Sequence, residues 1–284
     1  GASAATPVIW GDRVFATAAD PKTKKQSALC LDRRTGAQLW RAEISEFSTD
    51  GQSSNSCSPS PVTDGQLAVF FFGTGDLVAF DVAGKKLWER NIGPFAFQWT
   101  FSSSPLLHDG RLIMQVLQRD VAVRGNGKPT GNESFLLAMD PATGKDLWRH
   151  VRPSEAVAES REAFSTPLPF VHNGRAELVV VGGDAISGHE PTTGRELWRW
   201  GTWNSTRIGH WRLVPSPTVG SGVILACGPK DAPVYAVKAG GTGTLSHKSL
   251  AWQSHVQATD DAAEAAPSQN IRELTTDVPT PLFY

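Results

Sequence analysis

The chain contains 284 residues, of which 40% are hydrophobic and 19% are charged, and its formal net charge is −1 at pH 7. This composition is typical of a globular protein with a large hydrophobic core. A net charge near zero gives no electrostatic reason to expect nucleic acid as a partner, and no apolar run approaches the ~20 residues of a membrane span.

The three cysteines, Cys30, Cys57 and Cys227, lie far apart in the sequence. An odd number of widely spaced cysteines argues against a disulfide framework and against a structural zinc site. Because Cys30 and Cys227 lie in apolar, strand-like runs, we expect both to be buried free thiols.

A Ser-Pro or Thr-Pro step recurs along the chain and precedes two apolar runs separated by a glycine-centred turn. The copies begin at Thr6, Ser60, Ser104, Thr166, Ser216 and Thr280. Several of these turns are Asp-Gly or Asn-Gly pairs, which are strong signals for a β-hairpin because both turn positions need a positive φ. Each copy therefore predicts two paired strands.

A second string follows each hairpin, and residues 136–148 (LLAMDPATGKDLW) show it best. It reads as a strand that ends on an acid, a turn that contains glycine, and a strand that opens on Leu-Trp. Four copies have the glycine four residues before the tryptophan, and a fifth copy is eroded. The tryptophans are Trp40, Trp88, Trp148, Trp198 and Trp252, which gives steps of 48, 60, 50 and 54 residues.

Four antiparallel strands every ~40–50 residues are typical of the blades of a β-propeller. We therefore predict an all-β fold, with residues 1–284 forming a single propeller domain. Its blades span roughly 1–50, 51–97, 98–157, 158–208 and 209–274, and the next blade starts at 275–284. Five blades and one further strand lead us to expect a fragment of a propeller with 7–8 blades; a closed ring of five or six blades is the alternative.

Three segments depart from the repeat. Residues 119–134 form a polar, glycine-rich insertion between the second and third strands of the third blade. Residues 259–275 are acidic and without pattern, which predicts a surface loop, with a short helix near 262–266 as an option. The glycines at 240–243 loosen the turn of the fifth blade, so its last two strands are the least defined.

The string Asp-x-x-Thr-Gly-x-x-Leu-Trp resembles the tryptophan-docking motif of the propellers related to pyrroloquinoline quinone (PQQ) enzymes. This group includes quinoprotein alcohol dehydrogenases, the propeller lipoprotein of the bacterial outer-membrane assembly machine, and related envelope proteins. The resemblance implies that each docking tryptophan packs between neighbouring blades, against the turn of the next motif. It implies this structural role for Trp40, Trp88, Trp148, Trp198 and Trp252.

The acids of the same motif precede tight turns, where a carboxylate commonly accepts hydrogen bonds from backbone N–H groups. We expect this role for Asp32, Asp81, Asp140 and Glu190. Because each acid repeats, none of them marks a unique catalytic or metal site.

An active quinoprotein of the kind that the resemblance suggests holds calcium with Glu, Asn and Asp and has a pair of adjacent cysteines. This sequence has no adjacent cysteines, and no non-repeating set of Glu, Asn and Asp has a reason to converge. The seven histidines are scattered without an HExxH motif, and no G-x-S-x-G motif is present. We therefore expect no catalytic residues, no metal ligands and no cofactor; the alternative is PQQ with calcium.

The connections from each outer strand to the next inner strand break the repeat, and propellers usually bind ligands through such loops. Residues 52–55 form the first connection. Between Trp198 and Arg212 the sequence contains four tryptophans and three arginines, residue types that dominate binding hot spots. The candidate binding residues are Gln98, Trp99, Arg161, Glu162, Trp203, Arg207, His210, Trp211 and Arg212.

Two structural interpretations remain open for these residues. Trp203 and Trp211 could cap the blade and stack on arginine, and Arg161 could pair with Glu162.

The sequence thus predicts a non-catalytic binding scaffold, and its alternative is a PQQ-dependent dehydrogenase-like oxidoreductase. The scaffold would hold a protein, a peptide or a glycan through its channel-face loops, with no nucleic acid as partner and no membrane span in this chain. The resemblance alone implies a periplasmic or cell-envelope location and a likeness to outer-membrane assembly proteins.

Overall fold

The computed structural model describes residues 2–47, 56–123, 126–201, 203–230, 232–255 and 278–282. The first predicted connection, 52–55, and the acidic segment, 259–275, lie outside the described residues.

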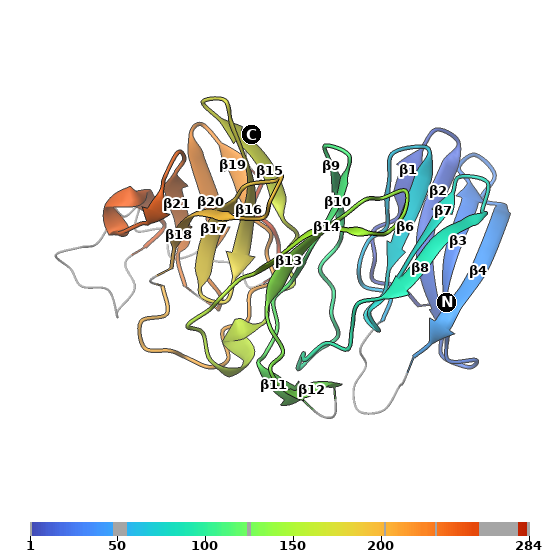
Figure 1. Cartoon of the computed structure of the whole chain (residues 1–284), viewed down its shortest axis with the longest axis horizontal. Helices are drawn as coiled ribbons and strands as arrows, with labels where there is room; N and C mark the ends of the chain where they lie inside the picture. The colour runs from blue at the N-terminus through green and yellow to red at the C-terminus, as the bar shows by residue number, and fades with distance from the viewer. Residues whose placement is uncertain are drawn as a thin grey trace. The chain divides into compact units, whose positions relative to one another are not determined.

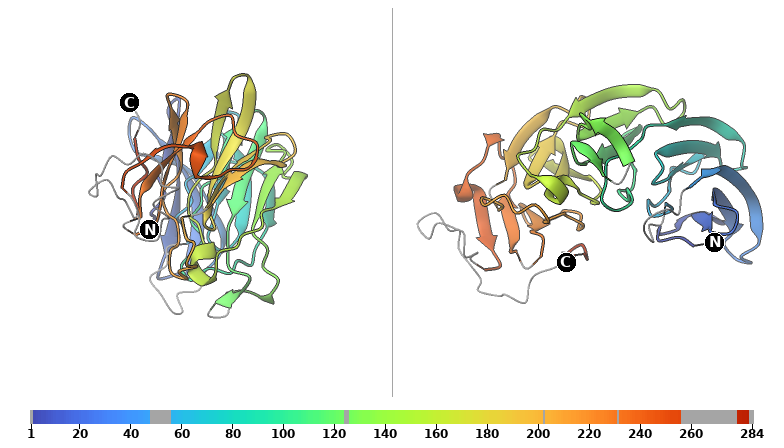
Figure 2. Two further views of the ribbon diagram at one scale, coloured as in Figure 1. Left: turned by 90° about the vertical axis from the view of Figure 1, so that its left-hand side faces the viewer. Right: turned by 90° about the horizontal axis from the view of Figure 1, so that it is seen from below.

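The described residues form successive sheets, each built on four strands that lie side by side in chain order (Figures 1 and 2). The first sheet consists of β1 (Val8–Trp10), β2 (Arg13–Asp20), β3 (Lys25–Asp32) and β4 (Gln38–Glu46). The second consists of β5 (Val62–Thr63), β6 (Leu67–Phe71), β7 (Asp76–Asp81) and β8 (Lys86–Asn91). The third consists of β9 (Leu106–His108), β10 (Arg111–Val116), β13 (Phe135–Met139) and β14 (Asp146–Val151).

The two remaining large sheets follow the same order. The fourth consists of β15 (Leu168–His172), β16 (Arg175–Gly182), β17 (Ala185–His189) and β18 (Glu196–Trp200), with a short fifth strand, β22 (Gly243–Thr244). The fifth consists of β19 (Thr218–Gly220), β20 (Val223–Cys227), β21 (Val234–Lys238) and β23 (Leu250–Gln253). Two 3₁₀ turns, η1 (Ala158–Arg161) and η2 (His247–Ser249), complete the elements. The all-β fold and its four-stranded antiparallel repeats are as the sequence predicts.

The chain divides into two compact units, which we describe separately. Unit 1 comprises Gly1–Met114, Asp120–Asn132 and Leu137–Leu147, and unit 2 comprises Gln115–Arg119, Glu133–Leu136 and Trp148–Tyr284. The division falls within the strands of the third sheet.

The core of unit 1 is rich in aromatic side chains from the middle strands. All residues of β6 are buried, which fits a continuous apolar run covered on both faces. Phe70 and Phe80 pack edge to face with 6.0 Å between ring centroids, and Trp40 packs on Phe80 at 5.2 Å. In contrast, β8 alternates between exposed and half-buried residues, as an outer strand should.

Three of the motif tryptophans make the same contact. Each donates its indole N–H to a carbonyl in the turn of the next repeat: Trp40 to Val82 (3.3 Å), Trp88 to Pro141 (2.7 Å) and Trp148 to Pro191 (3.1 Å). Each ring also covers the turn glycine of that repeat, where an added Cβ atom would lie within 2.7 Å of the ring. These glycines are Gly84, Gly144 and Gly194.

Trp198 does not make this contact, which corrects the expectation drawn from the motif. Its indole N–H donates to the carboxylate of Glu177, and its ring lies against Gly188 of the same sheet. The loosened turn of the fifth repeat instead supplies β22, which pairs in parallel with β18. Trp252 lies half-buried in β23 opposite Ala236, and its docking role stays a prediction.

The Ser/Thr-Pro steps are joined by hydrogen bonds that the sequence pattern does not reveal. The backbone N–H of one step donates to the hydroxyl of the next. In unit 1 these bonds run from Thr6 to Ser60 (2.9 Å) and from Ser60 to Ser104 (3.0 Å). In unit 2 they run from Thr166 to Ser216 (2.9 Å) and from Ser216 to Thr280 (3.0 Å). The residue before each proline therefore links neighbouring inner strands.

The turn acids largely behave as expected. The carboxylates of Asp32, Asp81 and Asp140 accept backbone N–H groups two to four residues ahead, so this prediction is confirmed for them. Hydrogen bonds from Thr35 lower the pKa of Asp32. The longer side chain of Glu190 instead accepts the hydroxyl of Thr193 (2.6 Å).

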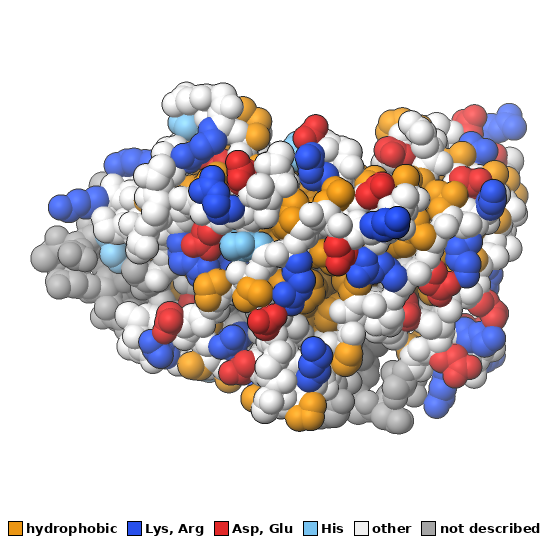
Figure 3. All heavy atoms as spheres, viewed as in Figure 1, with side chains coloured by type: hydrophobic (Ala, Val, Ile, Leu, Met, Phe, Trp, Pro, Cys, Tyr) orange, Lys and Arg blue, Asp and Glu red, His pale blue; other side chains and the backbone are white. Residues whose placement is uncertain are grey.

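The predicted insertion folds back on itself as a hairpin of β11 (Val121–Val123) and β12 (Asn126–Thr130). Cys30 and Cys227 are buried free thiols, so the prediction for them is confirmed, and Cys57 is also buried. No helix within the described part of the chain is long and apolar enough to cross a membrane. On the face drawn in Figure 3, Lys and Arg side chains lie among those of Asp and Glu, and neither sign of charge dominates.

Candidate functional site

The connection that follows β18, residues 203–212 in unit 2, folds as a closed loop around Asn204. The side chain of Asn204 is buried and accepts the backbone N–H of Ile208 (2.8 Å) through Oδ1. Its Nδ2 donates to the Ile208 carbonyl (3.0 Å) and to Asp184 Oδ2 (2.7 Å). One asparagine thus closes the loop and attaches it to the hairpin between β16 and β17.

The far end of this loop rests on η1. Ser160 Oγ donates to the carbonyl of Ile208 (2.5 Å) and accepts the backbone N–H of Trp211 (2.8 Å). The guanidinium of Arg212 donates to Glu159 Oε1 (3.3 Å), and the backbone N–H of Glu159 donates to the Gly209 carbonyl (2.9 Å). These bonds hold the backbone of the loop at both ends.

Two of the predicted binding residues are buried, which corrects their assignment to a binding surface. Trp203 is 2% exposed and its ring stacks on Tyr235, with 5.9 Å between centroids. Glu162 is fully buried, and its carboxylate accepts the Nε–H of Arg119 (2.5 Å). A tryptophan in this core excludes water by packing, and a buried carboxylate requires a paired cation. Both residues therefore support the fold beneath the loops.

The remaining residues of the loop do reach the surface. Arg207 and His210 are exposed, and Trp211 and Arg212 are half-buried. We call these four residues the loop surface. Arg161, in η1 next to it, is also half-buried.

Gln98 and Trp99 are not grouped with the loop surface, because they belong to unit 1 and the other candidates belong to unit 2. Trp99 is 45% exposed and Gln98 is half-buried.

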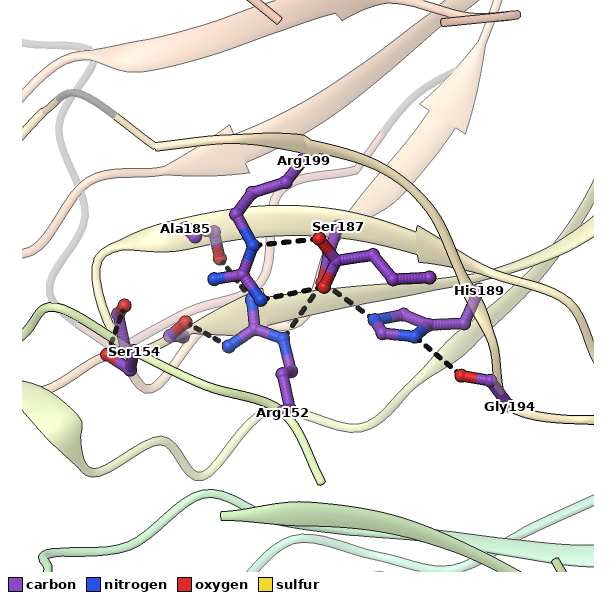
Figure 4. A network of polar contacts seen from close by, with 10 residues as sticks. Arg152, Ser154, Ala185, Ser187, His189, Gly194 and Arg199 are labelled. Atoms are coloured by element: carbon purple, nitrogen blue, oxygen red, sulfur yellow. Dashed lines mark hydrogen bonds and ion pairs between the residues drawn. The ribbon is translucent and has the colours of Figure 1, made fainter. Parts of the chain in front are cut away.

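A buried polar network lies under the same hairpin, in unit 2 (Figure 4). The guanidinium of Arg152, 1% exposed, donates to the carbonyls of Gly182 (2.8 Å) and Ala185 (3.0 Å) and to Ser187 Oγ (2.8 Å). His189 bridges Ser187 Oγ (2.9 Å) and the carbonyl of Gly194 (2.9 Å). The network fixes the backbone of the hairpin from below.

Proton positions in this network follow from what each partner can accept. The Gly194 carbonyl only accepts, so Nδ1 of His189 carries the proton and Nε2 accepts the Ser187 hydroxyl. Burial lowers the pKa of His189 to about 3, so the ring is neutral at neutral pH. Burial also lowers the pKa of Arg152 to about 9. These groups serve as a fixed hydrogen-bond chain.

A cavity of about 300 Å³ opens between this hairpin and the loop. The residues that line it include Glu155, Asp184, Arg199, Asn204, Ser205 and Arg207. Asp184 stands at the tip of the hairpin with φ of +60°, and burial raises its pKa to about 6. The sequence prediction did not include Asp184 or Asn204 among the site residues. The one sequence feature that could have indicated a site is that Asp184 follows two glycines in an unrepeated turn.

Within the described ranges, no three His, Cys, Asp or Glu side chains gather as possible ligands of one metal ion.

Similar proteins of known structure share the fold. BamB from Moraxella catarrhalis superposes with a TM-score of 0.54 at 16% identity, over 85% of this chain and 65% of that one. Quinohemoprotein alcohol dehydrogenase from Comamonas testosteroni gives a TM-score of 0.57 at 15% identity, over 94% of this chain and 45% of that one. Both likenesses show the β-propeller fold.

A curated relative matches part of the chain. Quinoprotein alcohol dehydrogenase PedH from Pseudomonas putida is 30% identical over 122 residues, which are 40% of this chain and 18% of PedH. The chain thus spans less than a fifth of that enzyme and about two thirds of the Moraxella protein.

A family model covers most of the sequence. It is the PQQ_2 model, described as outer membrane protein assembly factor BamB, and it matches residues 1–125 and 98–274. This match agrees with the tryptophan motifs and with the four-stranded sheets. The chain therefore belongs to the BamB-type family of PQQ-like β-propellers.

Proposed function

We propose that this chain is a non-catalytic β-propeller scaffold of the bacterial cell envelope that holds a protein partner during outer-membrane protein assembly. The family description, outer membrane protein assembly factor, supports a protein partner and an envelope location. The expected partner segment is an extended chain with alternating apolar and polar residues, as in a strand of an outer-membrane barrel.

The loop surface is the observation that carries this proposal. Its backbone is held by Asn204 and Ser160, while Arg207 and His210 stand exposed beside Trp211 and Arg212. A loop that is already ordered loses less conformational entropy on binding, and Trp and Arg contribute most at binding hot spots. The surface therefore suits recognition of a peptide.

The proposal is tested with a fluorescent synthetic peptide of alternating apolar and polar residues, titrated with the full chain by anisotropy. We expect saturable binding that weakens about tenfold in Trp211→Ala and in Arg212→Ala, which corresponds to ~1.4 kcal/mol. Arg195→Ala is the matched control, since Arg195 is an exposed arginine of unit 2 outside the loop surface, and it should bind as the parent does.

Thermal unfolding of each variant separates binding from folding. If Trp211→Ala and Arg212→Ala unfold at the assay temperature, the loop surface is a structural cap and the proposal fails. It also fails if the two variants bind the peptide as tightly as Arg195→Ala does.

A dehydrogenase-like oxidoreductase is the second candidate, and the likeness to PedH favours it. Adding PQQ and calcium to the full chain separates the two functions. The scaffold predicts no alcohol-dependent dye reduction and no saturable quinone binding. Calcium-dependent binding of PQQ would contradict the scaffold function and support the oxidoreductase.

A further inference from the structure

The cavity between the β16–β17 hairpin and the 203–212 loop contains one carboxylate with an unusual set of partners. Asp184 accepts the amide of Asn204 (2.7 Å) and the indole N–H of Trp203 (3.4 Å), and both donors are neutral. Within the described residues Asp184 forms no ion pair, although it is half-buried. Partial burial of a carboxylate without a counter-ion costs free energy.

The other charged groups around the cavity already have partners. Arg199 makes two hydrogen bonds to Glu196, from Nε (2.9 Å) and from Nη2 (2.7 Å). Arg207 donates to Glu155 Oε2 (3.0 Å) at the exposed rim. The only unbalanced charge that faces the cavity among the described residues is therefore the Asp184 carboxylate.

Arg152 does not neutralise it. Its N–H groups donate to the Gly182 and Ala185 carbonyls and to Ser187 (Figure 4). Arg152 is not among the residues that line the cavity. Burial raises the pKa of Asp184 to about 6, the hydrogen bonds from Asn204 and Trp203 partly oppose this rise, and no arginine contributes.

We propose that this cavity binds an organic cation that carries N–H donors, a guanidinium or primary ammonium group, with Asp184 as its counter-ion. The charge-assisted hydrogen bond would replace the water that the carboxylate has lost. A volume of about 300 Å³ accommodates such a group with a short aliphatic chain. The cation can come from a free small amine or from an Arg or Lys side chain of a peptide.

The proposed binding depends on pH in a defined direction. The pKa of Asp184 is raised to about 6, so the carboxylate is charged above pH 6 and becomes neutral as the pH falls below it. The other charged groups that face it are Glu155, Arg199 and Arg207, with Arg152 beneath the turn. Cation affinity is therefore expected to fall about tenfold per pH unit below pH 6.

The test is calorimetric titration of the full chain with agmatine and with a blocked Gly-Gly-Arg-Gly-Gly peptide at pH 7.5 and pH 5. Tetramethylammonium, a cation without N–H donors, and acetate are the reference ligands. We expect saturable binding of agmatine or the peptide at pH 7.5 and none of the reference ligands. Tighter binding of agmatine would indicate that the ligand is a free amine, and tighter binding of the peptide would indicate an Arg or Lys side chain of a protein.

Two variants address the site directly. Asp184→Asn should weaken cation binding at least tenfold, and Asp109→Asn is its matched control, because Asp109 is also a turn aspartate with positive φ. Ser205→Trp should block the cavity from its exposed side without removing the hydrogen bonds of Asp184, and it decides the test if Asp184→Asn does not fold.

Failure to bind either cation, or unchanged affinity in Ser205→Trp and in a folded Asp184→Asn, would overturn the proposal. The inference does not rest on the proposed peptide-binding function, since Asp184 lies outside the loop surface, and Arg207 is the residue that the cavity lining and the loop surface share. Loss of cation binding with intact peptide binding, or the reverse, separates the two.

Discussion

The turn glycine of one repeat and the tryptophan of the repeat before it form a contact in which neither residue can be replaced easily. Gly144 has φ of +68°, and a Cβ atom there would meet the ring of Trp88 at 2.7 Å. Gly36 holds the same place in its motif with φ of +72°, but no atom lies within 4 Å of its would-be Cβ. Comparing substitutions at Gly144 and Gly36 therefore separates the free-energy cost of backbone strain from that of the contact with the tryptophan ring.

We predict that Gly144→Ala destabilises the protein more than Gly36→Ala does. Both variants place a Cβ on a left-handed residue, which costs ~1–2 kcal/mol. Gly144→Ala must also displace the Trp88 ring, which adds ~1–3 kcal/mol. The midpoints of urea unfolding measure the difference. Equal midpoints would show that the ring contact contributes nothing to stability.

At the level of single residues, repetition decides what can be predicted from the sequence. The turn acids Asp32, Asp81 and Asp140 are predictable because each copy confirms the other copies. The sequence predicts Trp203 as a binding residue, but its ring packs on Tyr235. The sequence of an unrepeated loop does not distinguish a tryptophan that faces water from one that packs in the core. Asp184 is missed because its importance comes from burial, which depends on the distant Asn204.

Strands are joined across sheets by the hydroxyls of the Ser/Thr-Pro steps. The Thr166 N–H donates to Ser216 Oγ, and the Ser216 N–H donates to Thr280 Oγ1. Proline fixes its own φ and restricts the preceding Ser or Thr to extended backbone, so each step presents its hydroxyl and N–H in the same way. The recurrence of Ser and Thr at this place thus has a physical cause.

We predict that Ser216→Ala lowers the free energy of unfolding by ~1 kcal/mol, because it removes the hydroxyl that accepts the Thr166 N–H. Ser216→Thr keeps the hydroxyl and is the matched control, since threonine already occupies this place at Thr6, Thr166 and Thr280. Chemical denaturation of both variants gives the comparison. A loss of equal size in Ser216→Thr would mean that the side-chain volume matters, and not the hydroxyl.

Most strands are predictable from the paired signals of Ser/Thr-Pro and Leu-Trp, but the fourth and fifth repeats show the limit. The glycines at 240–243 weaken the fifth motif, and the chain there forms β22, which pairs with β18 of the previous sheet. A two-residue parallel pairing has no sequence signal of its own. In the same strand, β18, the indole N–H of Trp198 donates to Glu177 and not to a carbonyl in the turn of the next repeat.

At the scale of the molecule, the repeats provide a scaffold and the unrepeated loops provide the candidate surface. The family model describes an outer membrane protein assembly factor, and the chain shares its fold with BamB and with quinoprotein dehydrogenases. The loop surface offers ordered backbone with exposed Arg207 and His210.

The most direct test of the proposed scaffold function is hydrogen–deuterium exchange of the full chain with and without the alternating peptide. The proposal predicts slower exchange confined to residues 203–212 and to η1. Protection along an outer strand instead, such as β4 or β8, would mean that the peptide adds to a sheet edge. Such a result, or no change in exchange at a saturating peptide concentration, would contradict recognition by the loop surface.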